Sequence, residues 1–200
     1  VGEDGKTHQC LDYVGAFRSM FGWKVIVPAD PNQTDRAVRT IPVTTGCVAI
    51  AMGRSKLPVI LGLDGEPLFA GDYEFEYGRA TWAREGADGV IMTMGTVAGA
   101  AVEASDLGAE HGLSLGVCIV SSPLELDDEA MARVADAPWV LVAEDHGSRT
   151  ELRIGALVAH AEATLSELHA TIEGLAYYQG FEVRLEPSDA EVQAPEVGAG

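Results

Sequence analysis

Cysteine is scarce in this 200-residue chain, with three residues at Cys10, Cys47 and Cys118. Their number is odd, they lie far apart, and no CxxC pair is present, so neither a disulfide framework nor a CxxC metal or redox site is expected. Each cysteine lies in or near an apolar segment. We therefore expect three buried free thiols in a reducing compartment, and a cytoplasmic protein.

Basic residues are also few, 13 against 31 acidic residues, which gives a formal net charge of −18. No basic stripe is available to release counterions, so neither nucleic acid nor an anionic membrane is expected as a partner. No apolar run reaches the roughly eighteen residues of a membrane helix, and the start of the sequence does not have the pattern of a signal peptide. What the chain does contain is 47% hydrophobic residues, enough to bury the core of one large domain or two small ones.

The first part of the chain has a strand–helix–strand pattern. Residues 24–28 (KVIVP) form a β-branched run, and residues 47–52 (CVAIAM) predict a second buried strand. Between them, Asp30 as N-cap, Pro31 at the first helical position and Gln33 three residues after the cap predict a capping box and a helix through residue 39. Because both strands are apolar throughout, a parallel sheet covered by helices is expected.

Residues 62–78 are rich in Gly, Asp and aromatics, which predicts a connection, with at most one edge strand. The strand–helix order then resumes with strands at 89–94, 115–120 and 139–144. Helices are predicted at 96–112 and 127–135, and Ser122 to Glu125 repeats the pattern of a helix cap. The sequence therefore predicts a second α/β unit.

Further along, residues 150–177 place apolar side chains at helical spacing, which predicts a long helix. The last fourteen residues, 187–200, are acidic and nearly free of bulky apolar side chains, which predicts a disordered tail. Two strands and one helix are too few for a stable parallel sheet. We therefore expect either a partner chain that supplies further strands to the first unit, or a longer protein of which this sequence is a part.

Residues 2–9 (GEDGKTHQ) are the first candidate site. Glycines allow tight turns and the close approach of a ligand. His8 is suited to proton transfer near neutral pH, and Asp4 to holding a hydroxyl or polarising the histidine. The alternative is an ordinary glycine-rich turn that carries a surface histidine.

Arg54 and Lys56 follow a predicted strand at its carboxyl end, where open α/β sheets bind ligands. The planar guanidinium of Arg54 suits a phosphate group, and Lys56 adds a second positive charge. The alternative is a surface loop that pairs with some of the many acidic residues.

Two other chemistries have weaker support. Glu144, Asp145 and His146 end a strand and suggest a hydrolase with Ser121 or Ser122 as nucleophile, but no GxSxG motif is present. The five histidines show neither an HExxH motif nor another paired-ligand spacing, so no metal ligands are expected in this chain.

On these residues the sequence resembles the transketolase family, and specifically the C-terminal section of its split, two-chain form. The GEDG-x-THQ run is very close to the family's GEDGPTHQ. The other segments that resemble the family are Phe17-Arg18, VIVPAD at 25–30, GRSKLP at 53–58, residues 89–96, and VLVAEDH at 140–146. The resemblance covers about residues 1–170, and its first sixty residues are the most specific.

The resemblance implies an α/β fold: the end of a parallel-sheet pyrimidine-binding-type domain (1–62), a connector (63–78), and a smaller three-layer C-terminal-type domain (79–180), before the acidic tail. It also implies two-carbon ketol transfer between sugar phosphates with thiamine diphosphate, as in the pentose phosphate pathway. By carry-over His8 is catalytic and lies beside the cofactor and the donor carbon, Asp4 binds a substrate hydroxyl, and Arg54 binds the sugar phosphate.

The departures from the family pattern concern the cofactor. The family's proline in the first motif is Lys6 here, and neither the glutamate that activates the cofactor nor the diphosphate-binding GDG…N motif with its Mg²⁺ or Ca²⁺ is present. The resemblance thus implies a cofactor held mainly by a partner chain, the N-terminal section, in a homo- or hetero-oligomer such as a dimer. The alternatives are a non-catalytic assembly subunit and a relative of deoxyxylulose-phosphate synthase, although the residues after the shared motif, Gln9-Cys10, differ from that enzyme.

Overall fold

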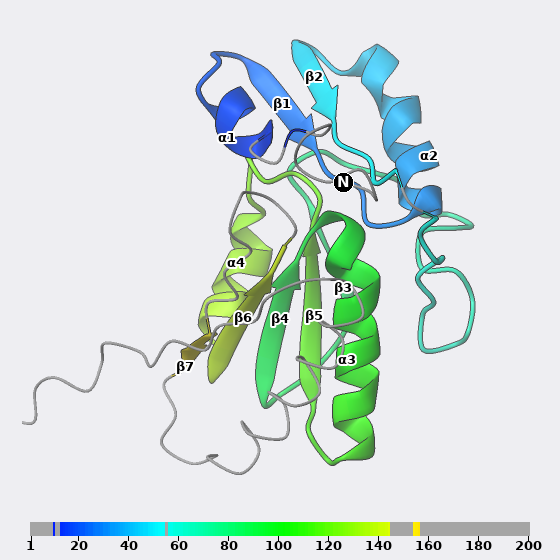
Figure 1. The fold of residues 1–200 in the computed structure, drawn as a ribbon, viewed down its shortest axis with the longest axis vertical. Coiled ribbons are helices and arrows are strands. Elements are labelled where there is room, and N and C mark those ends of the chain that lie inside the picture. The colour runs from blue at the N-terminus through cyan, green and yellow to red at the C-terminus, as the bar shows by residue number, and fades with distance from the viewer. Residues whose placement is uncertain (1–9, 11–12, 55, 145–153, 157–200) are drawn as a thin grey trace, which may run out of the picture.

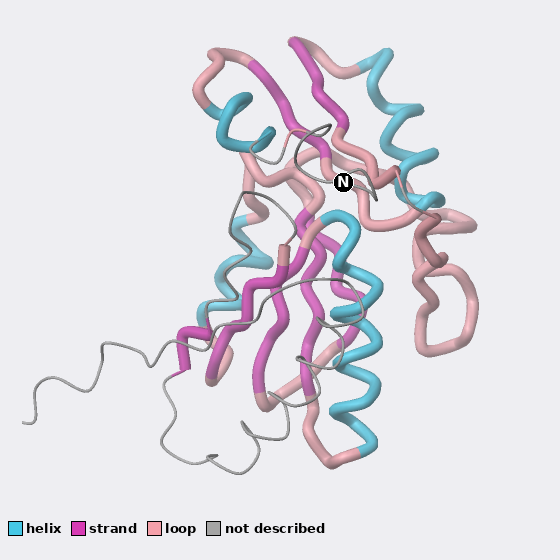
Figure 2. Tube along the Cα trace, in the orientation of Figure 1, coloured by secondary structure: helices cyan, strands magenta, loops and turns pink. Residues whose placement is uncertain are grey.

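The computed structural model describes residues 10, 13–54, 56–144 and 154–156, arranged around two β-sheets (Figures 1 and 2). The smaller sheet lies at one end of the molecule and the larger sheet at the other. None of the helices among these residues is long and apolar enough to cross a membrane. The predictions for Asp4, His8, the long helix beyond residue 156 and the tail at 187–200 lie outside the described residues.

The smaller sheet consists of strands β1 (Trp23–Ile26) and β2 (Cys47–Ile50), which pair in parallel with Val25 opposite Ala49. This confirms the predicted strand–helix–strand order. The helical elements of this unit are α1 (Tyr13–Arg18), α2 (Pro31–Thr40) and the 3₁₀ helix η2 (Ile41–Val43).

The outer edge of β1 is closed by hydrogen bonds from two amides. The Val25 amide donates to the Tyr77 hydroxyl at 3.3 Å, and the Val27 amide donates to the Ser121 carbonyl at 2.9 Å. Tyr77 belongs to the connector and Ser121 to the second unit, so this edge of the small sheet faces the rest of the chain.

Helix α2 begins as the sequence predicts, with one difference in its cap. The Asp30 carboxylate accepts the Gln33 amide at 2.7 Å, and Pro31 opens the helix. The Gln33 side chain turns back as in a capping box, but it accepts the amide of Ala29 at 2.7 Å rather than that of the cap residue. Both Asp30 and Gln33 are buried, so this helix start is part of the interior.

The larger sheet has the strand order β3-β5-β4-β6-β7. Its three central strands are parallel and confirm the predicted strands, while the two edge strands run antiparallel to them. The elements are β3 (Ala80–Arg84), β4 (Gly89–Thr93), the 3₁₀ helix η3 (Gly95–Val97), α3 (Ala98–Glu110), β5 (Leu115–Val120), α4 (Asp128–Ala135), β6 (Trp139–Ala143) and β7 (Ile154–Ala156).

Helices α3 and α4 cover opposite faces of the larger sheet (Figure 1). Side chains alternate along β5: Val117 and Ile119 pack with the α3 residues Ala101 and Val102, whereas Cys118 and Val120 pack with the α4 residues Ala130 and Val134. All six residues of β5 are buried. The second unit is therefore a three-layer α/β arrangement, as the sequence resemblance implies.

Two sequence predictions about secondary structure were wrong, and one strand was missed. Ile154 belongs to strand β7, which pairs with β6, because the open edge of β6 outweighs the helical spacing around it. Residues 122–125 form a turn in which the Ser122 carbonyl accepts the Glu125 amide, and the following helix takes Asp127 as its cap. Strand β3 was not predicted, because its short sequence ATWAR has no run of β-branched residues.

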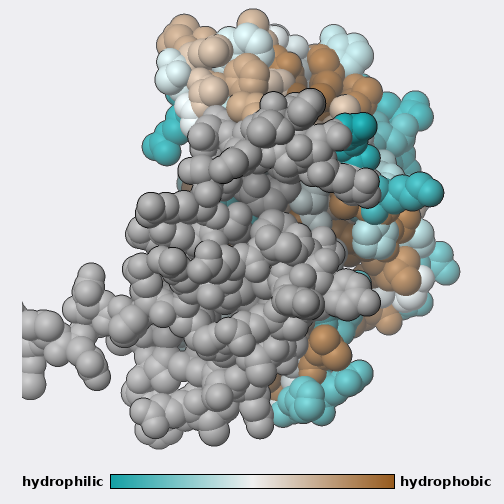
Figure 3. Space-filling model, viewed as in Figure 1, coloured by the Kyte–Doolittle hydropathy of each residue, from teal (hydrophilic) through white to brown (hydrophobic). Residues whose placement is uncertain are grey.

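Burial was also overestimated in the first unit. Strand β2 has no buried residue and Cys47 is exposed, as is Cys10, so only Cys118 is the buried thiol that was expected. The β2 residues Val48 and Ile50 pack against the cluster of Ile26, Ala37 and Phe75, but they are only partly buried. Figure 3 shows hydrophobic surface at the end of the molecule that carries the small sheet. The exposed hydrophobic side chains include Phe21, shortly before β1, and Val43, shortly before β2.

Candidate functional site

Arg54 lies at the edge of the small sheet where the sequence predicts it. Strands β1 and β2 are parallel, so both end at the same edge. After β1 the chain continues into the buried turn at residues 27–30, and after β2 it bends at Arg54, whose side chain is exposed. An exposed guanidinium at the carboxyl edge of a parallel sheet is suited to bind an anionic ligand.

The loop of residues 51–60, here called the Arg54 loop, is fastened at both ends to the segment that follows β1. At its start the Ala51 amide donates to the Ile26 carbonyl at 2.8 Å. At its end the Ile60 amide donates to the Asp30 carboxylate at 3.0 Å. The base of the loop is therefore set by residues 26–30, while Arg54 lies in the part between.

The middle of the Arg54 loop lies against the second unit. A Cβ atom added at Gly53 would be 2.6 Å from the Thr96 methyl group, so only glycine allows this approach. Similarly, Gly99 in α3 faces the Pro58 ring, at 3.6 Å from its own added Cβ. Arg54 is thus carried on a loop between the small sheet and the start of α3.

A buried polar cluster lies below this loop and joins three parts of the chain. The Gln33 side chain accepts the Ser121 hydroxyl at 2.9 Å and donates to the Tyr73 hydroxyl at 3.0 Å. Ser121 follows β5, Tyr73 belongs to the connector, and Gln33 is on α2. The cluster therefore fixes the small sheet, the connector and the larger sheet relative to one another.

This cluster leaves little support for the hydrolase alternative. Ser121 is 1% exposed and its hydroxyl donates to Gln33 rather than to a histidine. The neighbouring Ser122 hydroxyl is buried and has no hydrogen-bond partner among the described residues. Asp145 and His146 lie outside the described residues. Ser121 thus has a structural contact, and the hydrolase alternative, which already had weak support in the sequence, gains none from the structure.

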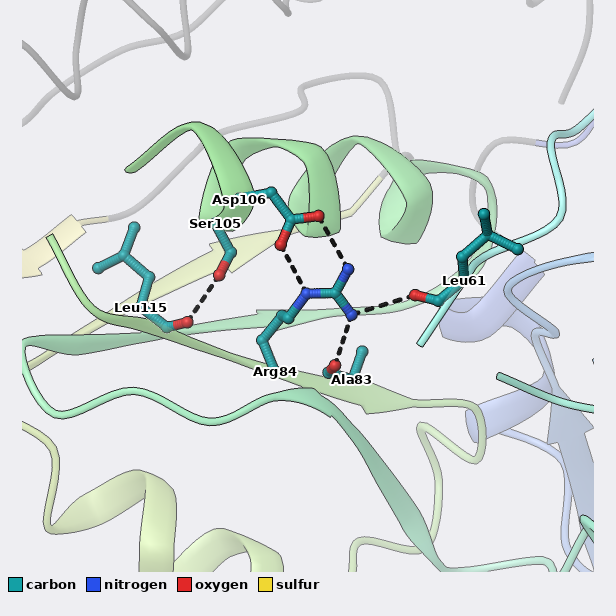
Figure 4. A network of polar contacts seen from close by, with 6 residues as sticks. All are labelled: Leu61, Ala83, Arg84, Ser105, Asp106 and Leu115. Carbon is teal, nitrogen blue, oxygen red and sulfur yellow. Dashed lines mark hydrogen bonds and ion pairs between the residues drawn. The ribbon is translucent and has the colours of Figure 1, made fainter. Parts of the chain in front are cut away.

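A second polar network fastens Leu61, just before the connector, to the larger sheet (Figure 4). The Arg84 guanidinium donates to both carboxylate oxygens of Asp106, at 2.6 and 2.8 Å, and also to the carbonyls of Leu61 and Ala83. The hydrogen bond to Asp106 raises the pKa of Arg84 above its usual value, against the effect of burial. Leu61 directly follows the Arg54 loop, so this network also fixes the chain leaving that loop.

The polar residues that join the small sheet, the connector and the larger sheet were not predicted from the sequence as a group. Asp30 and Gln33 were recognised only as a local helix cap, and their contacts to Ile60, Tyr73 and Ser121 span 30 to 88 residues. One signal could have indicated these contacts. Asp30 and Gln33 come soon after an apolar strand, where polar side chains are expected to be buried and therefore to need further hydrogen-bond partners.

The described residues do not fit the diphosphate end of thiamine diphosphate. That end requires a metal ion, and no group of three or more His, Cys, Asp or Glu residues in the described part of the chain is placed to hold one. At the carboxyl edge of the small sheet, both oxygens of Asp30 already accept amides. A cofactor and metal held mainly by a partner chain therefore remain a prediction.

Comparison with known proteins bears on these residues. Residues 1–59 match the family model described as the transketolase pyrimidine binding domain. One of the subunits of the apulose-4-phosphate transketolase of Phocaeicola vulgatus is 28% identical over 164 residues, 82% of this chain and 49% of that protein. A protein of Methanocaldococcus jannaschii described as a transketolase C-terminal section is 28% identical over 146 residues, 73% of this chain and 44% of that protein.

Among solved structures, a split-gene transketolase described as an inactive β4 tetramer superposes with a TM-score of 0.62 at 25% identity, covering 90% of this chain and 52% of that one. A 1-deoxy-D-xylulose-5-phosphate synthase of Magnetococcus marinus is 29% identical over 146 residues, 73% of this chain and 22% of that protein. The chain thus spans about half the length, or less, of the relatives it matches. The predicted fold class and the resemblance seen in the sequence are confirmed.

Proposed function

Because this chain is related to the transketolase family, through the C-terminal section of its split form, we propose that it is one component of a transketolase. It transfers a two-carbon ketol unit between sugar phosphates at an active site shared with a partner chain. The observation that carries this proposal is Arg54, an exposed guanidinium on a loop fastened at the carboxyl edge of the small sheet.

The role of Arg54 is to bind the phosphate of the sugar. Its planar fork can donate two parallel hydrogen bonds to phosphate oxygens. The glycine before it lets the loop lie close to Thr96, and the buried turn below keeps the loop base in place. The guanidinium thereby fixes the far end of the substrate and orients its reacting end.

The roles of Asp4 and His8 follow from the motif that they share with the family. Asp4 accepts a hydrogen bond from a substrate hydroxyl and selects its stereochemistry. His8 contacts the cofactor and the donor carbon, and stabilises charge or moves a proton there. In Lys6 this motif has a flexible residue where the family has proline, so we expect a less rigid turn.

Thiamine diphosphate supplies the carbanion chemistry of ketol transfer when it is bound, and a partner chain holds most of it together with Mg²⁺ or Ca²⁺. Two observations support a partner: the chain spans about half of its relatives, and one relative is named as a subunit. The partner is the N-terminal section. We place the assembled enzyme in the cytoplasm and in the pentose phosphate pathway.

We retain the domain boundaries of the sequence interpretation within this proposal. Residues 1–62 are the end of a pyrimidine-binding-type domain, 63–78 the connector, and 79–180 the C-terminal-type domain. The match of the pyrimidine-binding family model to residues 1–59 supports the first boundary.

The test is ketol transfer by the purified chain, alone and mixed with candidate N-terminal sections, thiamine diphosphate and Mg²⁺. Activity is expected only in a mixture and is expected to be lost in His8→Ala. Arg54→Ala is expected to raise KM for a phosphorylated donor about a hundredfold, because a charge-assisted phosphate contact is lost. The matched control is Arg39→Ala, an exposed arginine on α2 that pairs with Asp35. Unchanged KM in Arg54→Ala would contradict its role.

Two other functions have a specific observation in their favour. The solved split-gene structure is described as inactive, which favours testing a non-catalytic assembly subunit: a stable complex with no ketol transfer would support it. The match to a 1-deoxy-D-xylulose-5-phosphate synthase favours testing that reaction, and formation of 1-deoxy-D-xylulose 5-phosphate by the mixture would support it.

A further inference from the structure

Asp30 joins two structural elements with one carboxylate. It is completely buried, and one of its oxygens accepts the Gln33 amide at 2.7 Å, which caps α2. The other oxygen accepts the Ile60 amide at 3.0 Å, which holds the end of the Arg54 loop. A helix cap needs only the first of these bonds, so the second serves the loop.

The two ends of the Arg54 loop are held in different ways. Its start continues the sheet, since the Ala51 amide donates to the Ile26 carbonyl as a further rung of the β1–β2 pair. Its end, Ile60, lies ten residues beyond the last residue of β2. There the Ile60 amide donates to the Asp30 carboxylate, and the Ile60 carbonyl accepts the Leu68 amide of the connector at 2.8 Å. Removing the Asp30 acceptor would leave the end of the loop bound to the connector through Leu68, but no longer to the start of α2.

Asp30 is itself held rigidly. Its backbone carbonyl accepts both the amide and the hydroxyl of Thr34, at 2.9 and 2.8 Å. The adjacent Ala29 amide is held by Gln33, which is joined in turn to Ser121 and Tyr73. The carboxylate therefore has a fixed position relative to both sheets, and it transmits that position to the loop.

We propose that Asp30 is a positioning residue for phosphate recognition: it does not touch the substrate, but its bond to Ile60 keeps the Arg54 loop in the conformation in which Arg54 meets the phosphate. The proposal rests on the proposed function of Arg54. Because the carboxylate is buried and acts through the loop, its loss should affect phosphorylated substrates and leave the chemistry at the other end of the substrate unchanged.

The chain offers a matched control in Asp127. Its carboxylate caps α4, with one oxygen accepting the Glu129 and Ala130 amides at 3.1 Å, while the other accepts the Ala80 amide at 3.1 Å at the start of β3. Asp127 thus has the same double function as Asp30, but it fastens an edge strand of the larger sheet and not the Arg54 loop.

The experiment compares Asp30→Ser with Asp127→Ser. Serine keeps a helix cap but offers only one oxygen, so the remote amide loses its acceptor. Amide hydrogen exchange is measured in the full chain, and KM and kcat in the assembled enzyme, with a phosphorylated donor and with a donor that lacks the phosphate. Asp30→Asn is the second variant, because it retains the side-chain volume and still loses one acceptor oxygen.

For Asp30→Ser we expect faster exchange near Ile60, and a KM about tenfold higher for the phosphorylated donor, with kcat and the KM of the other donor within about twofold. Asp127→Ser should leave both KM values unchanged. Unchanged exchange near Ile60 in both Asp30 variants would overturn the proposal, as would equal effects on the two donors. If Arg54→Ala leaves KM unchanged, the proposed function fails, and hydrogen exchange still decides whether Asp30 holds the loop.

Discussion

The two sheets of this chain differ in how completely they are covered. In the larger sheet, every residue of β5 is buried between α3 and α4. In the small sheet, β2 has no buried residue, and Phe21 and Val43 are exposed beside it. The larger sheet finds its covering layers within the chain, whereas the small sheet has apolar surface that is still open. The difference indicates that the second unit is fully packed within the chain, whereas β2 is only partly buried against the Ile26, Ala37 and Phe75 cluster and exposed apolar side chains remain in this unit.

The largest effect on stability is expected for Gly89→Ala in the larger sheet. A Cβ at Gly89 would lie 2.2 Å from the Trp139 ring, so the ring or β4 would have to move from its packed position. We expect a loss of about 3 kcal/mol in the free energy of unfolding, measured by urea denaturation.

Gly15→Ala in α1 is the control for this substitution. Nothing lies within 4 Å of a Cβ at Gly15, and alanine favours a helix, so the variant should be neutral or slightly stabilising. Equal destabilisation by both substitutions would contradict the contrast between a tightly packed and an open unit.

The next effect concerns the network of Figure 4. Arg84→Met removes a buried guanidinium and leaves the Asp106 carboxylate, which is half exposed, without its partner. We expect a loss of about 2 kcal/mol, less than for a fully buried pair because water reaches Asp106. The matched control is Arg39→Met. Both Arg39 and its partner Asp35 are exposed, so this substitution should change the free energy of unfolding by less than about 0.5 kcal/mol.

The stability that the Asp127 carboxylate contributes at the start of α4 should depend on pH. Burial acts to raise the pKa of Asp127, but the amides of Ala130 and Ala80, the Arg79 charge and the Glu129 amide together lower it below its ordinary value of 3.8. A carboxylate with a depressed pKa stabilises the fold above its unfolded pKa, and this contribution is lost as the pH falls through the folded pKa.

The wild type should therefore exceed Asp127→Ala in stability by about 1 kcal/mol at pH 7, and this difference should shrink progressively as the pH falls from about 3.8 through the lower folded pKa of Asp127. Thermal unfolding of both proteins between pH 2 and 7 measures it. A difference that persists unchanged at pH 2 would mean that the carboxylate charge contributes nothing.

The smallest effect is a difference in reactivity that costs no stability. Burial, and then the nearby Asp127 charge, raise the pKa of the Cys118 thiol to about 12, whereas Cys10 and Cys47 are exposed. A thiol reagent at pH 8 should label two cysteines quickly and the third only after unfolding. If the partner chain covers β2, its addition should slow the labelling of Cys47. Fast labelling of all three in the folded chain would contradict the burial of β5.

The sequence predicted local features better than contacts between distant residues. The cap at Asp30 and strand β5 followed from short patterns, since a cap acts over three residues and a fully buried strand is apolar throughout. Strand β7 and the exposure of β2 could not be predicted from short patterns, because each depends on what lies beside the strand in space. Arg54 was placed correctly at the edge of the sheet, whereas the link from Asp30 to Ile60 has no signature in the sequence.

The closed edge of β1 determines on which side a further strand can pair with the small sheet. The Val25 and Val27 amides already donate to Tyr77 and Ser121, so an incoming strand cannot use them without breaking the junction to the connector and the second unit. Extension of this sheet, whether from the same polypeptide or another one, is therefore open only beside β2. The small sheet can therefore accept a further strand on one side only, because the second unit and the connector occupy its other edge.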